Sequence, residues 1–245
     1  MSKNKLCWAL IYTGKNKKIL ARTILLYEIL SKYTRKDIWV ITDSGENKRA
    51  LEQFCKNVYL PENEKKYSYD SIKKYPNIFI KFSIYELSKF GYTHCIEIDT
   101  DVIVNYDLVK HLGVFERYVL ENISEGQIAM HRYPVWETKS EYHGSCLIFN
   151  IEKDLSDDLL NLKKSVDGWD TEEVALTNYA RLNSHSVRDI PDGLICNQKE
   201  FSMFTIFKHL GGVMFYVALQ VTSDFNRYKE LCEIIETEGD DARLF

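Results

Sequence analysis

Two aspartates separated by one residue are the strongest chemical signal in this sequence. Asp99, Thr100 and Asp101 directly follow residues 95–98, a largely apolar run that predicts a buried strand. Ligands of α/β proteins bind in the crevice at the carboxyl ends of the strands, where two such carboxylates can bind one divalent cation. A hard cation with so few protein ligands takes its remaining ligands from water and substrate phosphates. The motif therefore predicts chemistry on a phosphorylated substrate, with a nucleotide as the expected carrier.

Composition places the chain among ordinary globular proteins. It has 245 residues, of which 45% are hydrophobic and 28% are charged, and this length is sufficient to bury a core. The formal net charge is -4 and the pI is about 5.9. A protein that binds nucleic acid through a broad basic face would carry the opposite charge, so that class is not expected.

The sequence favours a soluble, cytoplasmic protein. The apolar run at 6–12 is too short for a signal peptide, and no run approaches the ~20 apolar residues that cross a bilayer. The six cysteines are scattered and form no CxxC pair. We therefore expect reduced, mostly buried thiols and no transmembrane segment.

Elements that must position the aspartates are predicted by hydrophobic periodicity. Strands are expected at 5–12, 38–41, 58–60, 95–98, 127–131 and 146–150, with weaker signals at 185–190 and 204–208. Helices are expected at 17–32, 46–56, 77–90, 154–165, 171–183 and 223–236. Gly91 is expected to end the third of these helices. Strands and helices alternate in the first half and mix in the second, which is typical of an α/β fold.

The order of these elements and motifs resembles that of the GT-A glycosyltransferases, in particular the glycogenin-like family 8. The resemblance extends over about residues 6–212. It is carried in order by Ile-Tyr-Thr at 11–13, Ile-Lys-Phe at 80–82, Asp-Thr-Asp at 99–101, His-Gly-Ser-Cys-Leu-Ile-Phe-Asn at 143–150, Trp-Asp-Thr-Glu-Glu at 169–173 and His-Leu-Gly-Gly at 209–212. It implies a Rossmann-like, mostly parallel central sheet flanked by helices. It also implies one domain over 1–245, with a nucleotide-binding half at 1–110 and a mixed acceptor-side half, including a C-terminal helix, at 111–245.

The resemblance further implies a metal-dependent reaction. A sugar would move from a nucleoside-diphosphate sugar, expected to be UDP-linked, to a hydroxyl group of a glycan, lipid or protein. Mn²⁺ or Mg²⁺ would be the cofactor, and no nucleic acid would take part. Family members retain the anomeric configuration. If a glutamate of this chain instead deprotonates the acceptor hydroxyl, the reaction would invert.

The expected metal ligands are Asp99, Asp101 and His209. The two aspartates would bind the cation that neutralises charge on the departing diphosphate. His209 resembles the third protein ligand of the family, and an imidazole beside two carboxylates suits Mn²⁺ better than oxygen ligands alone. Glu97 shares a strand face with Asp99, and we expect it to have a structural or supporting role.

Donor-binding residues are expected on both sides of the metal motif. Lys81 stands where the family places a lysine that faces the donor, although a surface lysine with a buried stem is the alternative. Tyr12 and Thr13 would border the base and ribose, and Tyr12 could equally be a core residue. Thr100 and Gly212 complete the set that the resemblance implies.

The acid or nucleophile candidates are Glu173, Glu172 and Asp170. Glu173 aligns best with the active-site aspartate of the family. The same residues also fit a capping box, in which Asp170 caps a helix and Glu173 occupies its third position. Acids in a first helical turn are in addition favoured by the helix dipole, so a purely structural role remains open for all three.

Further candidates carry weaker signals. His143, with Gly144 and a serine after it, stands where the family lines the acceptor side, and a small residue there lets a sugar approach the backbone. Asp192 flanks the same side in the resemblance. Arg22 is a candidate for a phosphate contact from the first helix.

Three other protein classes share part of this pattern. A haloacid-dehalogenase-like phosphatase also follows an apolar strand with two aspartates, but needs a later acidic pair in a strand context that this chain lacks. A nicotinamide-dependent oxidoreductase would need a GxGxxG turn, which is absent. A noncatalytic nucleotide-sugar binder would keep Asp99, Asp101 and His209 without a working acid at 170–173.

Overall fold

The structure is a computed structural model of the 245-residue chain. It describes residues 5–68, 77–132, 141–162, 172–190, 193–197, 204–209, 218–219 and 224–238. Within these residues, no helix is long and apolar enough to cross a membrane. The six cysteines are free thiols, and all except the partly exposed Cys232 are buried, as the sequence predicts.

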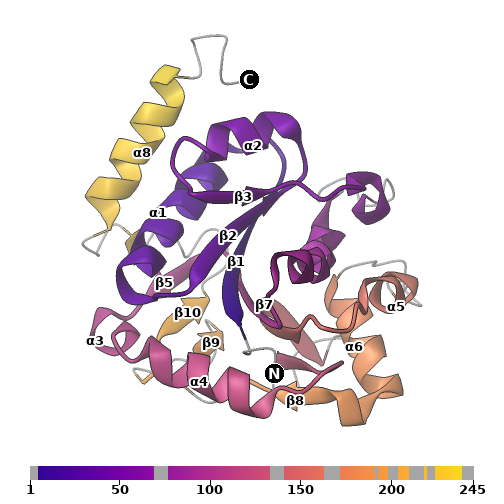
Figure 1. The fold of residues 1–245 in the computed structure, drawn as a ribbon. Coiled ribbons are helices and arrows are strands. Elements are labelled where there is room, and N and C mark those ends of the chain that lie inside the picture. Colours follow the sequence, from indigo (N-terminus) through magenta and orange to yellow (C-terminus); the bar gives the residue numbers. More distant parts are fainter. Residues whose placement is uncertain are drawn as a thin grey trace.

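A seven-stranded sheet forms the centre of the molecule (Figure 1). The strand order is β3-β2-β1-β4-β7-β6-β8. Strands β3, β2, β1 and β4 run parallel, whereas β7 is antiparallel to both of its neighbours, β4 and β6. The strands span Leu6–Tyr12 (β1), Asp37–Thr42 (β2), Asn57–Tyr59 (β3), His94–Ile98 (β4), Ile128–Arg132 (β6), Tyr142–Asn150 (β7) and Val187–Asp189 (β8). This arrangement confirms the predicted α/β fold with a mostly parallel sheet.

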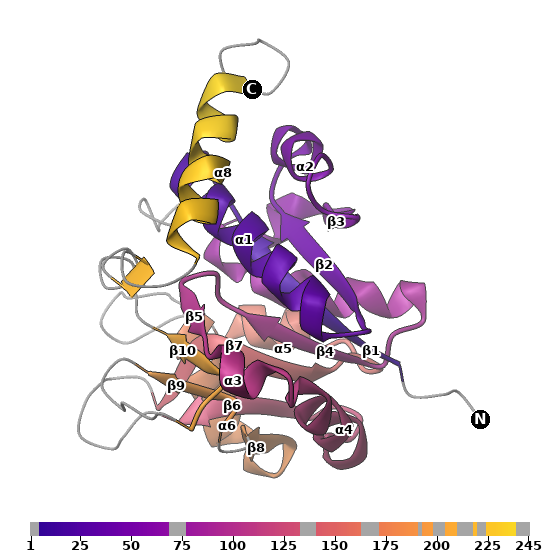
Figure 2. The same cartoon turned by 90° about the vertical axis from the view of Figure 1, so that its left-hand side faces the viewer.

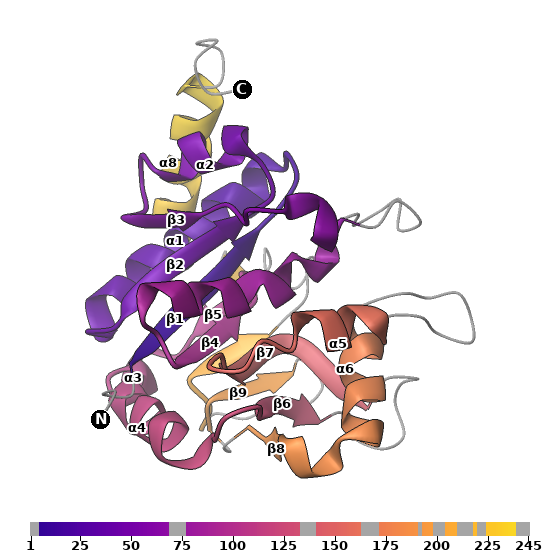
Figure 3. The ribbon, with the colours of Figure 1, turned by 45° about the vertical axis from the view of Figure 1, so that its right-hand side comes forward.

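Helices cover both faces of this sheet. Successive side chains of a strand point to opposite faces, so Trp8 and Leu10 of β1 belong to one core cluster and Cys7 and Ala9 to the other. The first cluster lies under α1 and α8, which run side by side in Figure 2. The second lies under η2, α5 and α6, the last two of which flank β7 in Figure 3. The bounds are Lys17–Tyr33 (α1), Phe225–Glu238 (α8), Ile78–Phe90 (η2), Ser156–Asn161 (α5) and Glu172–Leu182 (α6).

A second, three-stranded sheet joins the two halves of the chain. It consists of β5 (Val102–Val104), β10 (Phe207–His209) and β9 (Ile195–Asn197), in that order. Strand β10 is antiparallel to β5, and His209 is opposite Val102 in the register. This pairing brings His209 beside the Asp99–Thr100–Asp101 turn, more than a hundred residues earlier in the sequence.

Most predicted elements are present, but strands β5 and β9 and helix α3 (Tyr106–Val109) were not predicted. Two further differences are informative. The expected helix at 77–90 is a 3₁₀ helix, η2, which ends before Gly91 at a φ of +81°. Helix α4 (Leu112–Asn122) was not among the predicted elements. Its buried residues Leu112, Glu116 and Val119, with the partly buried Phe115 and Leu120, recur at helical spacing, so the signal for this helix was present in the sequence. The remaining short helices are Gly45–Leu51 (α2), Glu64–Tyr67 (η1) and Ser184–Ser186 (η3).

Candidate functional site

A cleft of about 430 Å³ lies at the carboxyl ends of β1 and β4. One wall comes from the end of β1 and the start of α1, and the other from η2 and the start of α6. The turn after β4 forms the floor. The lining residues are Ile11, Thr13, Asn16, Ile19, Arg22, Asn77, Ile78, Lys81, Asp99, Thr100, Asp101 and Glu172. This position agrees with the rule that ligands of α/β sheets bind beyond the carboxyl ends of the strands.

Asp99, Asp101 and His209 form one cluster in this region. Each offers a ligand atom, and the three atoms lie within 4.8 Å of one another. His209 Nε2 is 3.2 Å from Asp101 Oδ1 and 4.0 Å from Asp99 Oδ2. The structure therefore brings together the three residues predicted from sequence as metal ligands.

Electrostatics at this cluster favour a cation. Burial alone would lower the pKa of His209, but a hydrogen bond with Asp101 and the charges of both aspartates raise it above its ordinary value. Burial also opposes ionisation of Asp101, yet His209 and the charge of Arg22 hold its pKa below the usual range. Two carboxylates that stabilise a protonated imidazole between them would also stabilise a divalent ion, and two oxygens with one imidazole nitrogen suit Mn²⁺.

Lys81 lies beneath this cluster and is almost completely buried. Its Nζ donates hydrogen bonds to Asp99 Oδ1 at 2.6 Å and to the carbonyl oxygen of Gly144 at 2.7 Å. Glu97 and Glu172 approach the same nitrogen to 3.6 and 3.8 Å. Burial lowers the pKa of Lys81, but the charges of Asp99, Glu97 and Glu172 outweigh it and hold this pKa well above its ordinary value. Lys81 is therefore a charged residue that orients Asp99, and the surface-lysine alternative is not what the structure contains.

Glu97 is a fully buried carboxylate on the central strand β4. Its neighbours in the register are Ala9 of β1 and Leu147 of β7. Within the described residues, neither carboxylate oxygen has a hydrogen-bond partner, and Lys81 is its ion-pair partner. Burial raises the pKa of Glu97 to about 8, against the opposing effect of Lys81. A buried carboxylate with so little hydrogen bonding is costly, which marks this end of β4 as an electrostatically strained place.

Two consecutive glutamates at the start of α6 lie on either side of Gly144. Glu172 lines the cleft, and burial raises its pKa to about 7. A Cβ atom at residue 144 would lie only 3.0 Å from Glu172 Oε1, so a larger residue there would require the Glu172 side chain to shift. Glu173 Oε1 instead accepts a hydrogen bond of 3.1 Å from the Gly144 N–H. The residue that faces the cleft is thus Glu172, while Glu173 attaches α6 to β7.

His143 is a neutral histidine next to the metal-ligand cluster. Its Nδ1 accepts a hydrogen bond of 3.0 Å from the Ser145 N–H, so the ring proton belongs on Nε2. Its ring meets that of His209 edge-on, with centroids 4.6 Å apart. Burial, followed by the charges of His209 and Lys81, lowers the pKa of His143 to about 2. The chain therefore supplies one neutral and one chargeable imidazole at this place.

The remaining candidates are placed as follows. Thr13 and Thr100 line the cleft. Tyr12 is 2% exposed and packs in the core cluster under α1, which is the second of its two expected roles. Asp170, Asp192 and Gly212 lie outside the described residues, so their predicted roles remain predictions.

Sequence reasoning missed an anchor for the β1 side of the cleft. Asp43, just after β2, accepts hydrogen bonds from Asn77 at 2.6 Å, from the Gly14 N–H at 3.0 Å and from Asn47 at 2.7 Å. Asn77 is itself a lining residue, as is Asn16, whose side chain caps α1. An aspartate at the carboxyl end of a parallel strand was the available signal, because it lies at the edge where the cleft forms.

Comparison with known proteins is informative at the level of structure. No protein-family model matches the chain, and no curated protein matches it by sequence. Among solved structures, mouse xyloside xylosyltransferase 1 superposes with a TM-score of 0.59 at 10% identity, over 86% of this chain and 99% of that one. The galactosyltransferase LgtC superposes with a TM-score of 0.59 at 11% identity, over 93% of this chain and 95% of that one. A glycosyltransferase involved in glycosylation of the major capsid of PBCV-1 superposes with a TM-score of 0.55 at 14% identity, over 93% of this chain and 98% of that one.

The chain has the GT-A fold. Coverage above 90% of both chains for two of these neighbours means that the likeness includes the second half of the chain as well as the first. The GT-A fold implied by the sequence resemblance is thus confirmed. At such low identity the likeness concerns the fold, and the chemistry must be argued from the site.

Proposed function

We propose that this protein is a metal-dependent glycosyltransferase that uses a nucleoside-diphosphate sugar, with a UDP-sugar as the expected donor. The observation that carries the proposal is the convergence of Asp99, Asp101 and His209 on one point. Asp99 and Asp101 line a cleft that also contains Lys81 and Glu172, in the fold of known glycosyltransferases. The acceptor would be a hydroxyl group of a glycan, lipid or protein.

The donor would lie along the cleft, with its diphosphate at the Asp99–Asp101 turn. Asp99, Asp101 and His209 would hold Mn²⁺ or Mg²⁺, which supplies Lewis-acid stabilisation of the negative charge on the departing diphosphate. Lys81 would fix the orientation of Asp99 through their 2.6 Å hydrogen bond, leaving Asp99 Oδ2 directed toward His209. Thr13, at the end of β1, would border the nucleoside.

Glu172 is the best-placed carboxylate for the transferring sugar. It lines the cleft, and burial raises its pKa to about 7, so both protonation states are accessible near neutral pH. A group of this kind can hold or accept a proton in the transition state. We assign Glu172 the role that faces the sugar, and Glu173 the role of holding Gly144 and α6 in place. By its resemblance to family 8, the transfer would retain the anomeric configuration, whereas a Glu172 that deprotonates the acceptor hydroxyl would make it invert.

This assignment can be tested with two isosteric variants. We expect Glu172→Gln to lower kcat by about 10²-fold or more, because the change removes a carboxylate that acts in the transition state. Glu173→Gln should lower the melting temperature and change kcat by less than tenfold. If Glu173→Gln abolishes turnover while Glu172→Gln is active, the two roles are reversed. If both variants merely melt at lower temperature, these glutamates are helix-capping residues.

The proposed activity itself is tested by product formation. The protein would be incubated with UDP-, GDP-, ADP- and CMP-sugars, each with EDTA or with Mn²⁺, and release of the free nucleotide would be followed. Hydrolysis of one UDP-sugar that depends on Mn²⁺ would support the proposal, since transferases commonly hydrolyse their donor slowly without acceptor. If a nucleotide sugar binds in the presence of Mn²⁺ but no nucleotide is released, even after a panel of sugar acceptors is added, the result would support the noncatalytic binder. Hydrolysis of simple phosphate esters would support the phosphatase.

A further inference from the structure

One arginine occupies the α1 wall of the cleft. Asn16, Ile19 and Arg22 are spaced three residues apart, so they lie on the same side of the helix, and all three are lining residues. Most other buried residues of α1, such as Leu20 and Ile24, are apolar. Arg22 is the one charged side chain among the buried residues of this helix.

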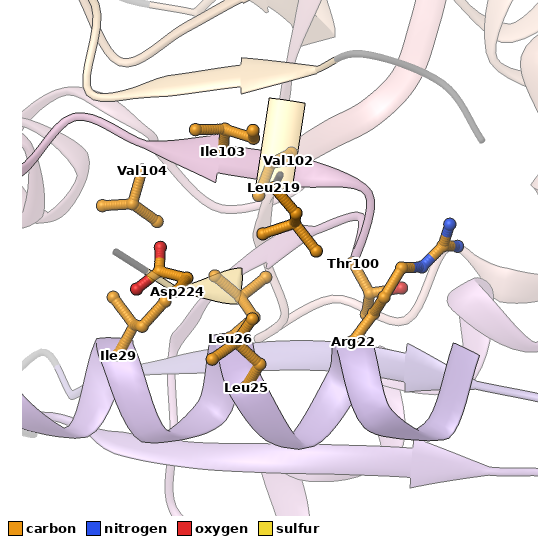
Figure 4. Close-up of a pocket in the computed structure, with 10 residues that line it drawn as sticks. All are labelled: Arg22, Leu25, Leu26, Ile29, Thr100, Val102, Ile103, Val104, Leu219 and Asp224. Atoms are coloured by element: carbon orange, nitrogen blue, oxygen red, sulfur yellow. The ribbon is translucent and has the colours of Figure 1, made fainter. Parts of the chain in front are cut away.

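The arginine is buried, but its charged end is directed out of the core. Its residue is 8% exposed. Figure 4 shows its stem beside Thr100, with the guanidinium turned away from Leu25, Leu26 and the other apolar residues of that pocket. Arg22 and Thr100 line both the narrow apolar pocket in that figure and the polar cleft. An arginine stem that packs on apolar surface while the head reaches a polar space is a common arrangement.

Arg22 and Lys81 are the positively charged lining residues of the cleft within the described part of the chain, and they differ in what surrounds them. Lys81 belongs to the wall formed by η2 and is surrounded by Asp99, Glu97 and Glu172 within 3.8 Å. Arg22 lies on the opposite wall, and its charge reaches Asp101, whose pKa it helps to lower. The acidic floor thus has one positively charged side chain on each of the two walls beside it.

We propose that Arg22 binds the diphosphate of the nucleotide donor from the α1 wall of the cleft. This assignment rests on the proposed function. A diphosphate held at the Asp99–Asp101 turn would lie between the floor and α1, within the region that Arg22 lines. The guanidinium is permanently charged and presents a planar fork of donors that matches phosphate oxygens, which a lysine cannot reproduce. Arg22 would also offset the repulsion between the phosphates and the acidic floor.

The test compares ligands that differ only in phosphate, on Arg22→Gln and Arg22→Lys. Calorimetric titration would give the dissociation constants of UDP and of Mn²⁺, and NMR titration that of uridine. We expect Arg22→Gln to weaken UDP binding by ~10–100-fold, while uridine binding stays within twofold. Arg22→Lys should recover part of the loss. Lys32→Gln, which removes an exposed positive charge from the last turn of the same helix, serves as the matched control and should bind UDP like the wild type.

Mn²⁺ binding without nucleotide separates a direct contact from a damaged cleft. Loss of a positive charge near Asp101 cannot weaken a cation site electrostatically, so Arg22→Gln should bind Mn²⁺ at least as tightly as the wild type. Unchanged UDP affinity in Arg22→Gln, or an equal loss for UDP, uridine and Mn²⁺, would overturn the assignment while leaving the proposed function intact. A wild-type protein that binds no nucleoside diphosphate with Mn²⁺ would overturn both.

Discussion

The two ends of strand β4 differ in how their buried polar side chains are paired. His94 begins the strand and Glu97 lies near its end, and both side chains are buried. His94 is matched by neutral partners at each ring nitrogen. Glu97 is one of several acids gathered around Lys81. The same strand thus supports the fold at its amino end and creates an electrostatically strained site at its carboxyl end.

The amino end shows how this chain satisfies a buried polar group. His94 Nδ1 is 2.8 Å from the Thr93 hydroxyl and Nε2 is 2.7 Å from the carbonyl oxygen of Ile123. Burial lowers the pKa of His94, so the ring is kept neutral. A similar solution occurs on α4, where Glu116 accepts hydrogen bonds from Trp8 and Thr34. Paired in this way, buried polar groups add stability and order.

At the carboxyl end, the buried polar groups lack this hydrogen bonding. Glu97, Asp99 and Glu172 approach Lys81 within 3.8 Å, and both oxygens of Glu97 have no hydrogen bond within the described residues. Such crowding destabilises the fold and shifts pKa values, which is common at functional sites. Burial alone therefore does not identify a functional acid. A buried acid that lacks hydrogen-bond partners for its charge is the better indication of a functional site.

The largest expected effect comes from removing one charge at the carboxyl end. Asp99→Asn should lower metal-dependent turnover by ~10³-fold or more, because it removes a cation ligand and the partner of Lys81. The free energy of unfolding should fall by less than the ~3–5 kcal/mol typical of a broken buried ion pair, since Lys81 keeps Glu97, Glu172 and the Gly144 carbonyl as partners. Steady-state kinetics and urea denaturation measure the two quantities. Full activity in Asp99→Asn would refute the metal assignment.

The matched change at the amino end of β4 should lower stability and leave turnover nearly unchanged. His94→Ala removes a ring that satisfies Thr93 and Ile123 and leaves a cavity, so we expect the free energy of unfolding to fall by about 2–4 kcal/mol. The kcat at 25 °C should remain within twofold of the wild type. A variant that keeps its stability but loses turnover would show that this end of β4 takes part in the reaction, and the comparison would fail.

The smallest effect is a pH dependence of opposite sign at the two ends. The unfolded chain binds more protons at His94 below its ordinary pKa of 6.5, so this residue costs stability as pH falls through that value. The native state binds more protons at Glu97 between 4.5 and about 8, so this residue costs stability as pH rises through that window. Melting temperatures measured with EDTA should therefore decline less at high pH in Glu97→Gln, and less at low pH in His94→Gln. Identical pH profiles for both variants and the wild type would contradict these protonation states.

Much of the fold was accessible from the sequence because it depends on local patterns. Apolar runs predicted the strands of the central sheet, and the spacing of apolar residues predicted helix α1. Gly91 predicted where η2 ends. The 3₁₀ geometry of η2 depends on tertiary packing. Helix α4 was missed although its apolar residues have helical spacing, whereas the burial of Glu116 could not be predicted because its partners, Trp8 and Thr34, are distant in sequence.

The candidate site was predictable in its residue types and less so in its arrangement. Asp99, Asp101 and His209 could be proposed together, although only the pairing of β5 with β10 brings them into contact. Which of Glu172 and Glu173 faces the cleft could not be predicted, because it depends on how α6 meets Gly144. The part played by Asp43 is similarly a product of packing, since its partners come from three separate segments.

The measurement that tests the central claim most directly is thermal unfolding of the wild-type protein with UDP, Mn²⁺, both, or neither. A ligand at ~100 times its dissociation constant adds about 2.7 kcal/mol to the free energy of unfolding. If Asp99, Asp101 and His209 form a metal site that receives a nucleotide diphosphate, UDP should raise the melting temperature by several degrees when Mn²⁺ is present and very little when it is absent. Equal stabilisation by UDP with EDTA, or no response to any nucleoside diphosphate, would contradict the account.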